Sequence, residues 1–185
     1  MNLLRVKIIV ALGVGVLAFA VFFLLWEREG TEGLEQGGAI EEEVGRGVQS
    51  VVVVFADPSA TRLVEETREI EVPEDRAKRG MRIMEELARG PRGGGGVRTL
   101  PQGTLIRSVV FDDRGGAFVD FSRELIDGHP GGSTGELMTI SSVVQTLVRN
   151  FPDVAQVTFL VEGRQIESVA GHIDATVPFS VDQYR

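Results

Sequence analysis

The longest uninterrupted apolar stretch of the chain is residues 8–26, which carry no charged side chain. A helix rises about 1.5 Å per residue, so this run comes close to the roughly 30 Å hydrocarbon thickness of a bilayer. Arg5 and Lys7 precede the run and Glu27 follows it. The basic flank 1–7 is therefore expected to stay cytoplasmic, with residues 8–26 as a single-pass transmembrane signal anchor and the rest extracytoplasmic.

A cleaved signal peptide is the alternative interpretation, because Ala18-Phe19-Ala20 resembles a small-residue cleavage site. The apolar run continues directly from Val21 to Trp26, whereas a cleavage site normally opens into polar sequence. The pattern therefore favours an anchor that is not cleaved.

Polar positions dominate the next segment, residues 27–48. It holds seven Glu, two Arg and six Gly, for a formal charge of −5. Such a composition cannot bury enough apolar surface to offset the entropy lost on ordering. We expect an acidic, disordered tether.

Short apolar runs separated by turn residues begin after residue 48 and predict strands. Residues 50–56 are a β-branched run typical of an interior strand, and residues 62–72 alternate loosely, as a more exposed partner would. The segment 112–116, Asp-Asp-Arg-Gly-Gly, has hairpin chemistry. The predicted strands are 50–56, 62–72, 104–111, 117–122, 154–161 and a short one at 165–169.

Two segments have helical periodicity instead. Pro73-Glu74-Asp75 places a proline and two acids where a helix begins, and an apolar stripe follows. The second helix has the strongest stripe of the chain, and the glycine-rich segment 90–103 is predicted to be a mobile loop. The two stripes are Ala77, Met81, Met84 and Ala88, then Leu137, Ile140, Val144, Leu147 and Phe151.

The resulting order is β-β-α-β-β-α-β-β, which predicts an α+β domain over residues 49–185. Its sheet is expected to be mixed or antiparallel, with two helices on one face, and one transmembrane helix precedes the domain.

Charge and composition exclude some functions. The net charge of the chain is −8. Subtracting +2 for Arg5 and Lys7 and −5 for the tether leaves −5 on residues 49–185, with no basic stripe, so nucleic acid is not an expected partner. There is no cysteine, which excludes disulfides and a lipid-modified cysteine anchor.

One stretch suggests catalysis, since Gly131 to Gly135 fit the G-x-S-x-G pattern of a hydrolase nucleophile around Ser133. His129 and Asp127 precede it, so a surface serine hydrolase is an alternative function. The hydrolase motif, however, needs a strand running into the turn and places its acid and histidine after the serine. Ser133 and Glu136 instead fit a capping box, and that interpretation predicts that Ser133→Ala costs about 1 kcal/mol.

No catalytic, cofactor-binding or metal-binding residue is predicted elsewhere. The two histidines, His129 and His172, have no metal-ligand spacing, and the tetraglycine 93–96 lacks the Lys-Ser/Thr of a phosphate-binding loop. A small-ligand or glycan sensor with segment 90–103 as a lid is a further alternative. The aromatic platforms usual for sugars are scarce, because Trp26 lies in the anchor and Tyr184 is the single tyrosine.

Several stretches taken together resemble the GerMN domain, named from the sporulation and germination protein GerM. The resemblance covers about residues 50–180 and includes "LPQGTLIRSVVFDDRGGAFVDFSREL" and "GGSTGELMTISSVVQTLVRNFPDVAQVTFLVEGRQIESVAGHID". It implies a non-enzymatic module, similar to ring-building modules of sporulation and secretion complexes, in anchored envelope proteins. The positions 119–122 and 131–136 would be structural or interface elements. Unlike GerM, this chain has one copy of the domain and no lipobox cysteine.

These patterns predict a membrane-anchored extracytoplasmic scaffold or protein-interaction module of the bacterial envelope, related to sporulation or germination. Its expected partners are envelope proteins or further copies of the chain. Exposed strand edges, such as residues 165–169, are candidate places for a partner strand to pair.

Overall fold

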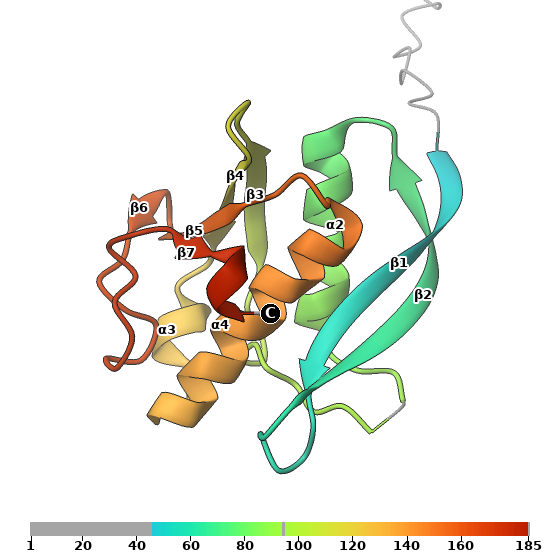
Figure 1. Cartoon of the computed structure of the whole chain (residues 1–185). Helices are drawn as coiled ribbons and strands as arrows, with labels where there is room; N and C mark the ends of the chain where they lie inside the picture. The colour runs from blue at the N-terminus through green and yellow to red at the C-terminus, as the bar shows by residue number, and fades with distance from the viewer. Residues whose placement is uncertain (1–45, 94, 185) are drawn as a thin grey trace, which may run out of the picture. The chain divides into compact units, whose positions relative to one another are not determined.

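The computed structural model describes residues 46–93 and 95–184 (Figure 1). The predicted flank 1–7, the predicted anchor 8–26 and most of the predicted tether 27–48 lie outside the described residues. Within the described part of the chain, no helix has the length and apolar character needed to cross a bilayer. The first strand begins at Arg46, inside the segment predicted to be a tether.

Seven strands form two separate sheets. Strands β1 (Arg46–Ala56) and β2 (Leu63–Pro73) pair antiparallel as a long hairpin. The larger sheet has the order β3-β4-β5-β6, with β7 also pairing with β5. In it β4 and β5 run parallel, and the other pairs are antiparallel. Its strands are β3 (Ile106–Phe111), β4 (Gly116–Phe121), β5 (Gln156–Val161), β6 (Arg164–Gln165) and β7 (Phe179–Ser180).

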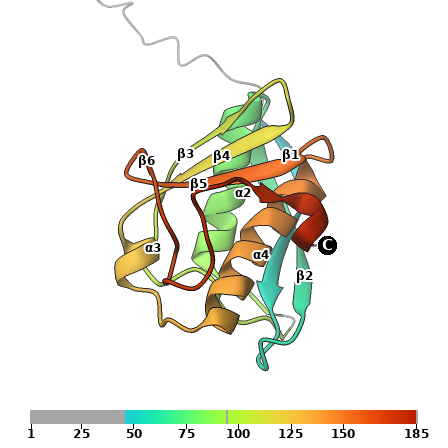
Figure 2. The same cartoon turned by 60° about the vertical axis from the view of Figure 1, so that its left-hand side comes forward.

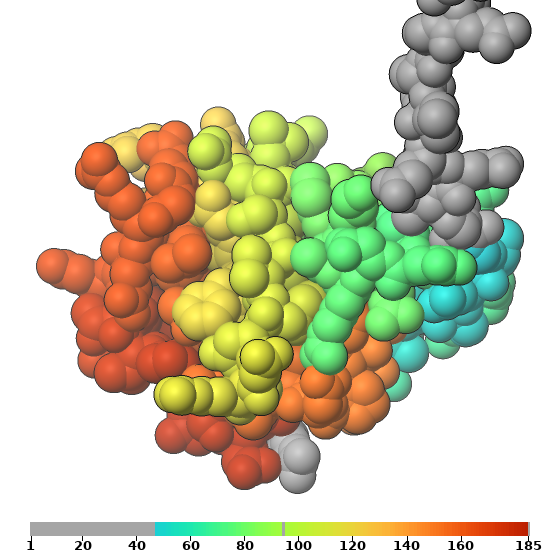
Figure 3. All heavy atoms as spheres, turned by 90° about the horizontal axis from the view of Figure 1, so that it is seen from above, coloured from blue at the N-terminus to red at the C-terminus, as the bar shows by residue number. Residues whose placement is uncertain are grey.

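Two long helices, α2 (Arg76–Arg89) and α4 (Ser133–Asn150), lie between the β1–β2 hairpin and the larger sheet (Figures 1 and 2). Two short elements, α3 (Glu124–Asp127) and the 3-10 helix η1 (Val181–Tyr184), were not predicted. Seen from above, the β3–β4 region lies between the N-terminal hairpin with α2 and the C-terminal segments (Figure 3).

The predicted α+β class and the order of the main elements are confirmed, but the prediction of one sheet is wrong. Side chains of α4 form hydrogen bonds with the backbone of β1 along the edge that does not pair with β2. Asn150 accepts from Val52 N at 3.0 Å and donates to Val52 O at 2.7 Å, and Thr146 Oγ1 accepts from Val54 N at 3.0 Å. Because these backbone groups already have partners, β1 cannot pair with a strand of the larger sheet.

The predicted start of the first helix is confirmed at Asp75, whose Oδ1 accepts from Lys78 N at 2.8 Å as the cap of α2, whereas Pro73 is the last residue of β2. The apolar stripe predicted for α2 is partly wrong. Met84 is buried, but Ala77, Met81 and Ala88 are only partly buried. The helix is rotated so that Gly80, Ile83 and Leu87 face the core together with Met84.

The stripe predicted for α4 is confirmed at four of its five positions, because Ile140, Val144, Leu147 and Phe151 are all buried. The exception is Leu137, which is 40% exposed. Aromatic rings extend the same core toward the C-terminus, where Phe159 packs against the rings of Phe121 and Phe179 at centroid distances of 5.3 and 5.1 Å.

Of the strand predicted at 165–169, only Gln165 lies in a strand, the two-residue β6. The later residues turn inward instead, and Val169 N donates to the carboxylate of Glu136 on α4 at 2.9 Å. The idea that 165–169 offers an edge to a partner strand is therefore wrong at Val169, whose N–H is already bonded.

The glycine-rich segment 90–103 was predicted to be mobile, but its described residues are held at several points. Val97 N donates to Ala56 O at 2.7 Å, which extends the covered edge of β1. The Arg98 guanidinium donates to the carbonyls of Ala88 and Arg89, the last turn of α2. These hydrogen bonds hold the segment against the last turn of α2 and against the end of β1.

Candidate functional site

The residues of the hydrolase hypothesis do not assemble into a catalytic group. Asp127 forms an exposed ion pair with Arg123, at 3.2 Å between Oδ2 and Nε. His129 Nδ1 accepts from Gly131 N at 3.0 Å, and His129 Nε2 lies 3.0 Å from Thr139 Oγ1. No hydrogen bond joins Ser133 to His129 or Asp127 among the described atoms.

The hydrogen bonds also determine which nitrogen of His129 carries the proton. Because Nδ1 accepts from a backbone N–H, the proton of the neutral ring is on Nε2. Nε2 then donates to Thr139 Oγ1, which itself donates to Thr99 O at 2.7 Å. Burial lowers the pKa of His129, and the nearby Glu136 charge opposes this only in part. His129 is therefore a neutral structural residue with neither nitrogen free to act as a base for Ser133.

The capping-box interpretation of Ser133 and Glu136 is also wrong. Gly132 is the N-cap of α4 and makes no side-chain bond, while Ser133 is the first helical residue and is exposed. Glu136 N donates to Gly132 O at 3.0 Å. The Glu136 side chain does not return to the amide of Ser133, because it is fully buried against another segment.

That segment is the loop 166–173, which wraps around the Glu136 carboxylate. Oε1 accepts from Val169 N and Ala170 N, both at 2.9 Å, and Oε2 accepts from His172 N at 2.8 Å. Burial raises the pKa of Glu136, but the backbone N–H groups outweigh burial and hold the pKa below its usual value of 4.5. Glu136 therefore fastens the loop after β6 to α4 as an anion.

Because Ser133 caps nothing, Ser133→Ala is expected to change the free energy of unfolding by less than about 0.5 kcal/mol. Alanine is also a better helix former than serine at this exposed position. Urea denaturation followed by far-UV circular dichroism measures the change. A loss of about 1 kcal/mol or more would restore a capping role for the hydroxyl.

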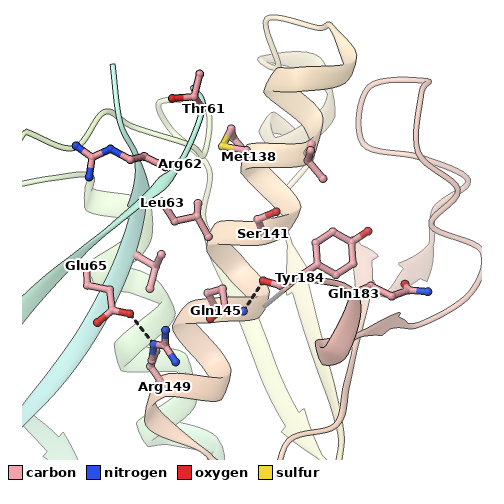
Figure 4. A pocket seen from close by; sticks show the side chains of 12 residues that line it. Thr61, Arg62, Leu63, Glu65, Met138, Ser141, Gln145, Arg149, Gln183 and Tyr184 are labelled. Atoms are coloured by element: carbon pink, nitrogen blue, oxygen red, sulfur yellow. Dashed lines mark hydrogen bonds and ion pairs between the residues drawn. The ribbon is translucent and has the colours of Figure 1, made fainter. Parts of the chain in front are cut away.

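An open groove lies where the tip of the β1–β2 hairpin faces α4 and η1 (Figure 4). Its volume is about 420 Å³. We call it the hairpin–α4 groove. It is lined by Val54 and residues 61–63 and 65 of the hairpin, by Leu137, Met138, Ser141, Gln145 and Arg149 of α4, and by Gln183 and Tyr184 of η1.

The hairpin side of this groove is positioned by Asp57. Its carboxylate accepts from Ser59 Oγ, from Thr61 N at 2.8 Å and from Arg62 N at 3.0 Å. These bonds, that of the Ser59 hydroxyl foremost, lower the pKa of Asp57 to about 2. The carboxylate is thus charged at any physiological pH and holds Thr61 and Arg62 at the rim.

Two contacts connect the walls of the groove. Arg149 Nε and Glu65 Oε1 are 2.7 Å apart, and Gln145 Nε2 donates to Tyr184 O at 2.5 Å (Figure 4). Leu137 and Met138 add an apolar stretch near the hairpin tip. The lining contains one acid, Glu65, which is paired with a cation, and no histidine. The groove therefore offers apolar contacts and hydrogen-bonding groups.

The residues that could bind a metal are not grouped. In residues 46–93 and 95–184 no set of three His, Cys, Asp or Glu side chains lies close enough to hold an ion. Asp112 of the β3–β4 turn uses Oδ1 to accept from Arg114 N at 2.8 Å and Gly116 N at 2.7 Å.

The hairpin–α4 groove was not predicted from the sequence. Leu137 belongs to a regular apolar stripe, so periodicity assigns it to the core, and nothing in the pattern shows that α4 extends past its partners there. A signal was present in "LMTISSVVQTL", where polar residues alternate with the stripe. They indicate that more than one face of α4 has a neighbour.

Fold and groove together define a small α+β domain with an open groove, in which Asp127, His129 and Ser133 form no catalytic group among the described residues. A family model described as Germane, sporulation and spore germination, matches residues 52–167. The chain belongs to this family, and the predicted likeness to GerMN domains is thereby confirmed. The chain matches no curated protein.

Three solved structures share the fold. A candidate lipoprotein from Clostridium perfringens is 22% identical, with a TM-score of 0.52 over 76% of this chain and 91% of that chain. The tandem GerMN domains of the sporulation protein GerM from Bacillus subtilis are 20% identical, with a TM-score of 0.58 over 73% of this chain and 47% of that chain. The first GerMN domain of GerM is 20% identical, with a TM-score of 0.56 over 71% of this chain and 97% of that chain. The chain therefore spans about half of the tandem structure.

Proposed function

We propose that this chain is a non-enzymatic, membrane-anchored interaction module of the bacterial envelope that acts in sporulation or germination. The observation that carries the proposal is the hairpin–α4 groove, an open surface with an exposed leucine and hydrogen-bonding groups on a domain of the Germane family. The apolar run 8–26 supports an anchor with the domain outside the membrane, and one structural relative is itself described as a candidate lipoprotein.

In this proposal the groove receives a surface element of another envelope protein. Leu137 and Met138 provide apolar area at one wall, and Arg62 and Gln183 provide donors at the rim. Interfaces of this kind combine a small apolar centre with a polar border. The walls are joined by the Arg149–Glu65 and Gln145–Tyr184 contacts, so the surface is largely formed before a partner arrives.

A photo-cross-linking amino acid placed at position 137 tests the proposal in membranes of the organism that makes the chain. We expect a covalent adduct with an envelope protein after irradiation. The same amino acid at Arg114, in the exposed turn between β3 and β4, is expected to give none. No adduct at position 137, or equal adducts at both positions, would refute the groove as the docking site.

Leu137→Glu provides a second measurement, because it introduces a charge into the apolar wall without removing a buried side chain. It is expected to weaken capture of the cross-linked partner by about tenfold or more. The matched control is Val177→Glu, which changes another exposed apolar residue outside this groove. If both variants capture the partner as well as the unmodified chain does, the proposal fails.

A further inference from the structure

A second groove lies between the C-terminal half of α2 and the beginning of β3. Its volume is about 500 Å³, and it shares no lining residue with the hairpin–α4 groove. One wall comes from Glu85, Ala88 and Arg89 of α2. Arg98 and residues 102–106 form the rest, and we call this surface the α2–β3 groove.

The backbone at the start of β3 faces this groove. β3 is the last strand of its sheet. Ser122 N donates to Leu105 O at 2.9 Å, so the carbonyl group of Leu105 points toward β4. The next residue, Ile106, lies opposite Phe121 in the register of the two strands. Phe121 O accepts from Glu162 N on the opposite side. In an antiparallel ladder the members of such a pair point away from each other, which directs the N–H and C=O of Ile106 to the free edge. Ile106 is itself 6% exposed, and the register of the ladder shifts between it and Ser108.

Positive charge is concentrated beside the same groove. Arg89 and Arg98 line it directly and are exposed. The surrounding network contains five guanidinium groups and three carboxylates, an excess of two positive charges in a chain whose net charge is −8. Its members are Arg68, Arg82, Arg89, Arg92 and Arg98, with Glu66, Glu85 and Glu86.

One further side chain suits an extended ligand. Leu105 is 65% exposed at the groove, which makes it an apolar contact point next to the strand edge.

We propose that the α2–β3 groove binds an extended acidic segment of a partner protein. The segment pairs its backbone with Ile106, places carboxylates beside Arg89 and Arg98, and rests an apolar side chain on Leu105. Strand addition of this type takes affinity from main-chain bonds and specificity from the neighbouring side chains. The inference rests on the proposed role as an interaction module and assigns it a second surface of different chemistry.

A labelled peptide tests the inference with the full chain in detergent micelles. The probe is a fluorescein-labelled decapeptide in which glutamate alternates with valine and threonine, and binding is read by fluorescence anisotropy. We expect saturable binding that weakens about tenfold or more when the glutamates are replaced by glutamine, and also in Leu105→Glu. Raising the salt concentration is expected to weaken it further.

The matched control is Val177→Glu, which changes an exposed apolar residue outside both grooves and is expected to bind the probe within about twofold of the unmodified chain. If Leu105→Glu fails to fold by circular dichroism, Arg89→Gln replaces it, with an expected loss of about fivefold. Failure of the partner cross-link at position 137 would leave this inference intact, because the two tests use different grooves.

Five outcomes would overturn the inference. The first four are no saturable binding of the acidic probe, equal binding of the glutamine probe, unchanged binding in a folded Leu105→Glu or in the Arg89→Gln variant that replaces it, and an equal loss in Val177→Glu. Displacement of the probe by an equal concentration of a peptide of residues 27–48 would also overturn it, since the acidic segment of the chain itself would then be the ligand.

Discussion

Glu86→Gln is expected to lower the free energy of unfolding by about 4 kcal/mol, because it removes the buried carboxylate that pairs with Arg68 and Arg92 and leaves the buried Arg68 guanidinium with Glu66 alone. The side chains of Glu86 and Arg68 are 0% and 1% exposed, and Glu86 Oε2 lies 2.9 Å from Arg68 Nη1. Glu86 Oε2 also accepts from Arg92 Nη2 at 2.6 Å. Glutamine preserves the shape but not the charge that compensates Arg68 in the interior.

The measurement is urea denaturation of the full chain in detergent, followed by far-UV circular dichroism. Arg123→Gln is the control, since its ion pair with Asp127 is 66% and 61% exposed and is expected to contribute less than about 0.5 kcal/mol. The double variant Arg68→Met with Glu86→Leu is expected to cost less than the sum of its two single changes. A loss below about 1 kcal/mol in Glu86→Gln would contradict the importance of the pair.

Glu136→Gln is expected to cost about 3 kcal/mol, the second-largest effect among the substitutions considered. Three backbone N–H groups, those of Val169, Ala170 and His172, point at the carboxylate of Glu136, whose side chain is 0% exposed. An amide presents one oxygen and one NH₂ group, so an N–H donor of the loop must face another donor. Hydrogen bonds to a buried charged acceptor are worth about 1.5–3 kcal/mol each, and replacing the acceptor leaves a donor unsatisfied.

The control for this prediction is Glu167→Gln in the same loop. The side chain of Glu167 is exposed, so we expect a change within about 0.5 kcal/mol. Hydrogen exchange adds a local measurement. The amides of Val169, Ala170 and His172 are expected to exchange faster in Glu136→Gln, whereas unchanged exchange would mean that the loop is held by other contacts.

The effect of Glu136→Gln also depends on pH. The pKa of Glu136 in the folded chain lies below its usual value of 4.5, so its contribution to stability is complete above about pH 4.5. As the pH falls through the folded pKa, the carboxylate takes up a proton and the contribution is lost. We therefore expect the difference between the original chain and Glu136→Gln to be largest near neutral pH and to shrink in acid.

Much of the fold follows from local sequence. The valine run of β1, the Asp75 cap of α2 and the stripe of Ile140, Val144 and Leu147 each predict the element that forms, because side-chain periodicity and capping act within a few residues. The apolar run 8–26 predicts an anchor from its length and flanking charges, and it stays a prediction because these residues lie outside the described part of the chain. Family membership is also carried by the linear sequence, over residues 52–167.

The roles of the polar residues were decided by tertiary structure. Ser133 and Glu136 have the spacing of a capping box, yet Glu136 binds a loop more than thirty positions later in the chain. Thr146 and Asn150 look like ordinary polar positions of a helix, yet they close the edge of β1 and so divide the strands into two sheets. No local pattern contains these partners, because they meet only after folding.

The sequence by itself thus determined the class of fold, the order of its main elements, the family and the expectation of an anchor, all of which depend on neighbours along the chain. Tertiary structure alone decided that His129 has no free nitrogen, that Leu137 and Leu105 stay exposed, and that two separate grooves form. The physical reason is that a hydrogen bond or a contact is worth most between buried groups, and which groups become buried together depends on the packing of all the elements at once.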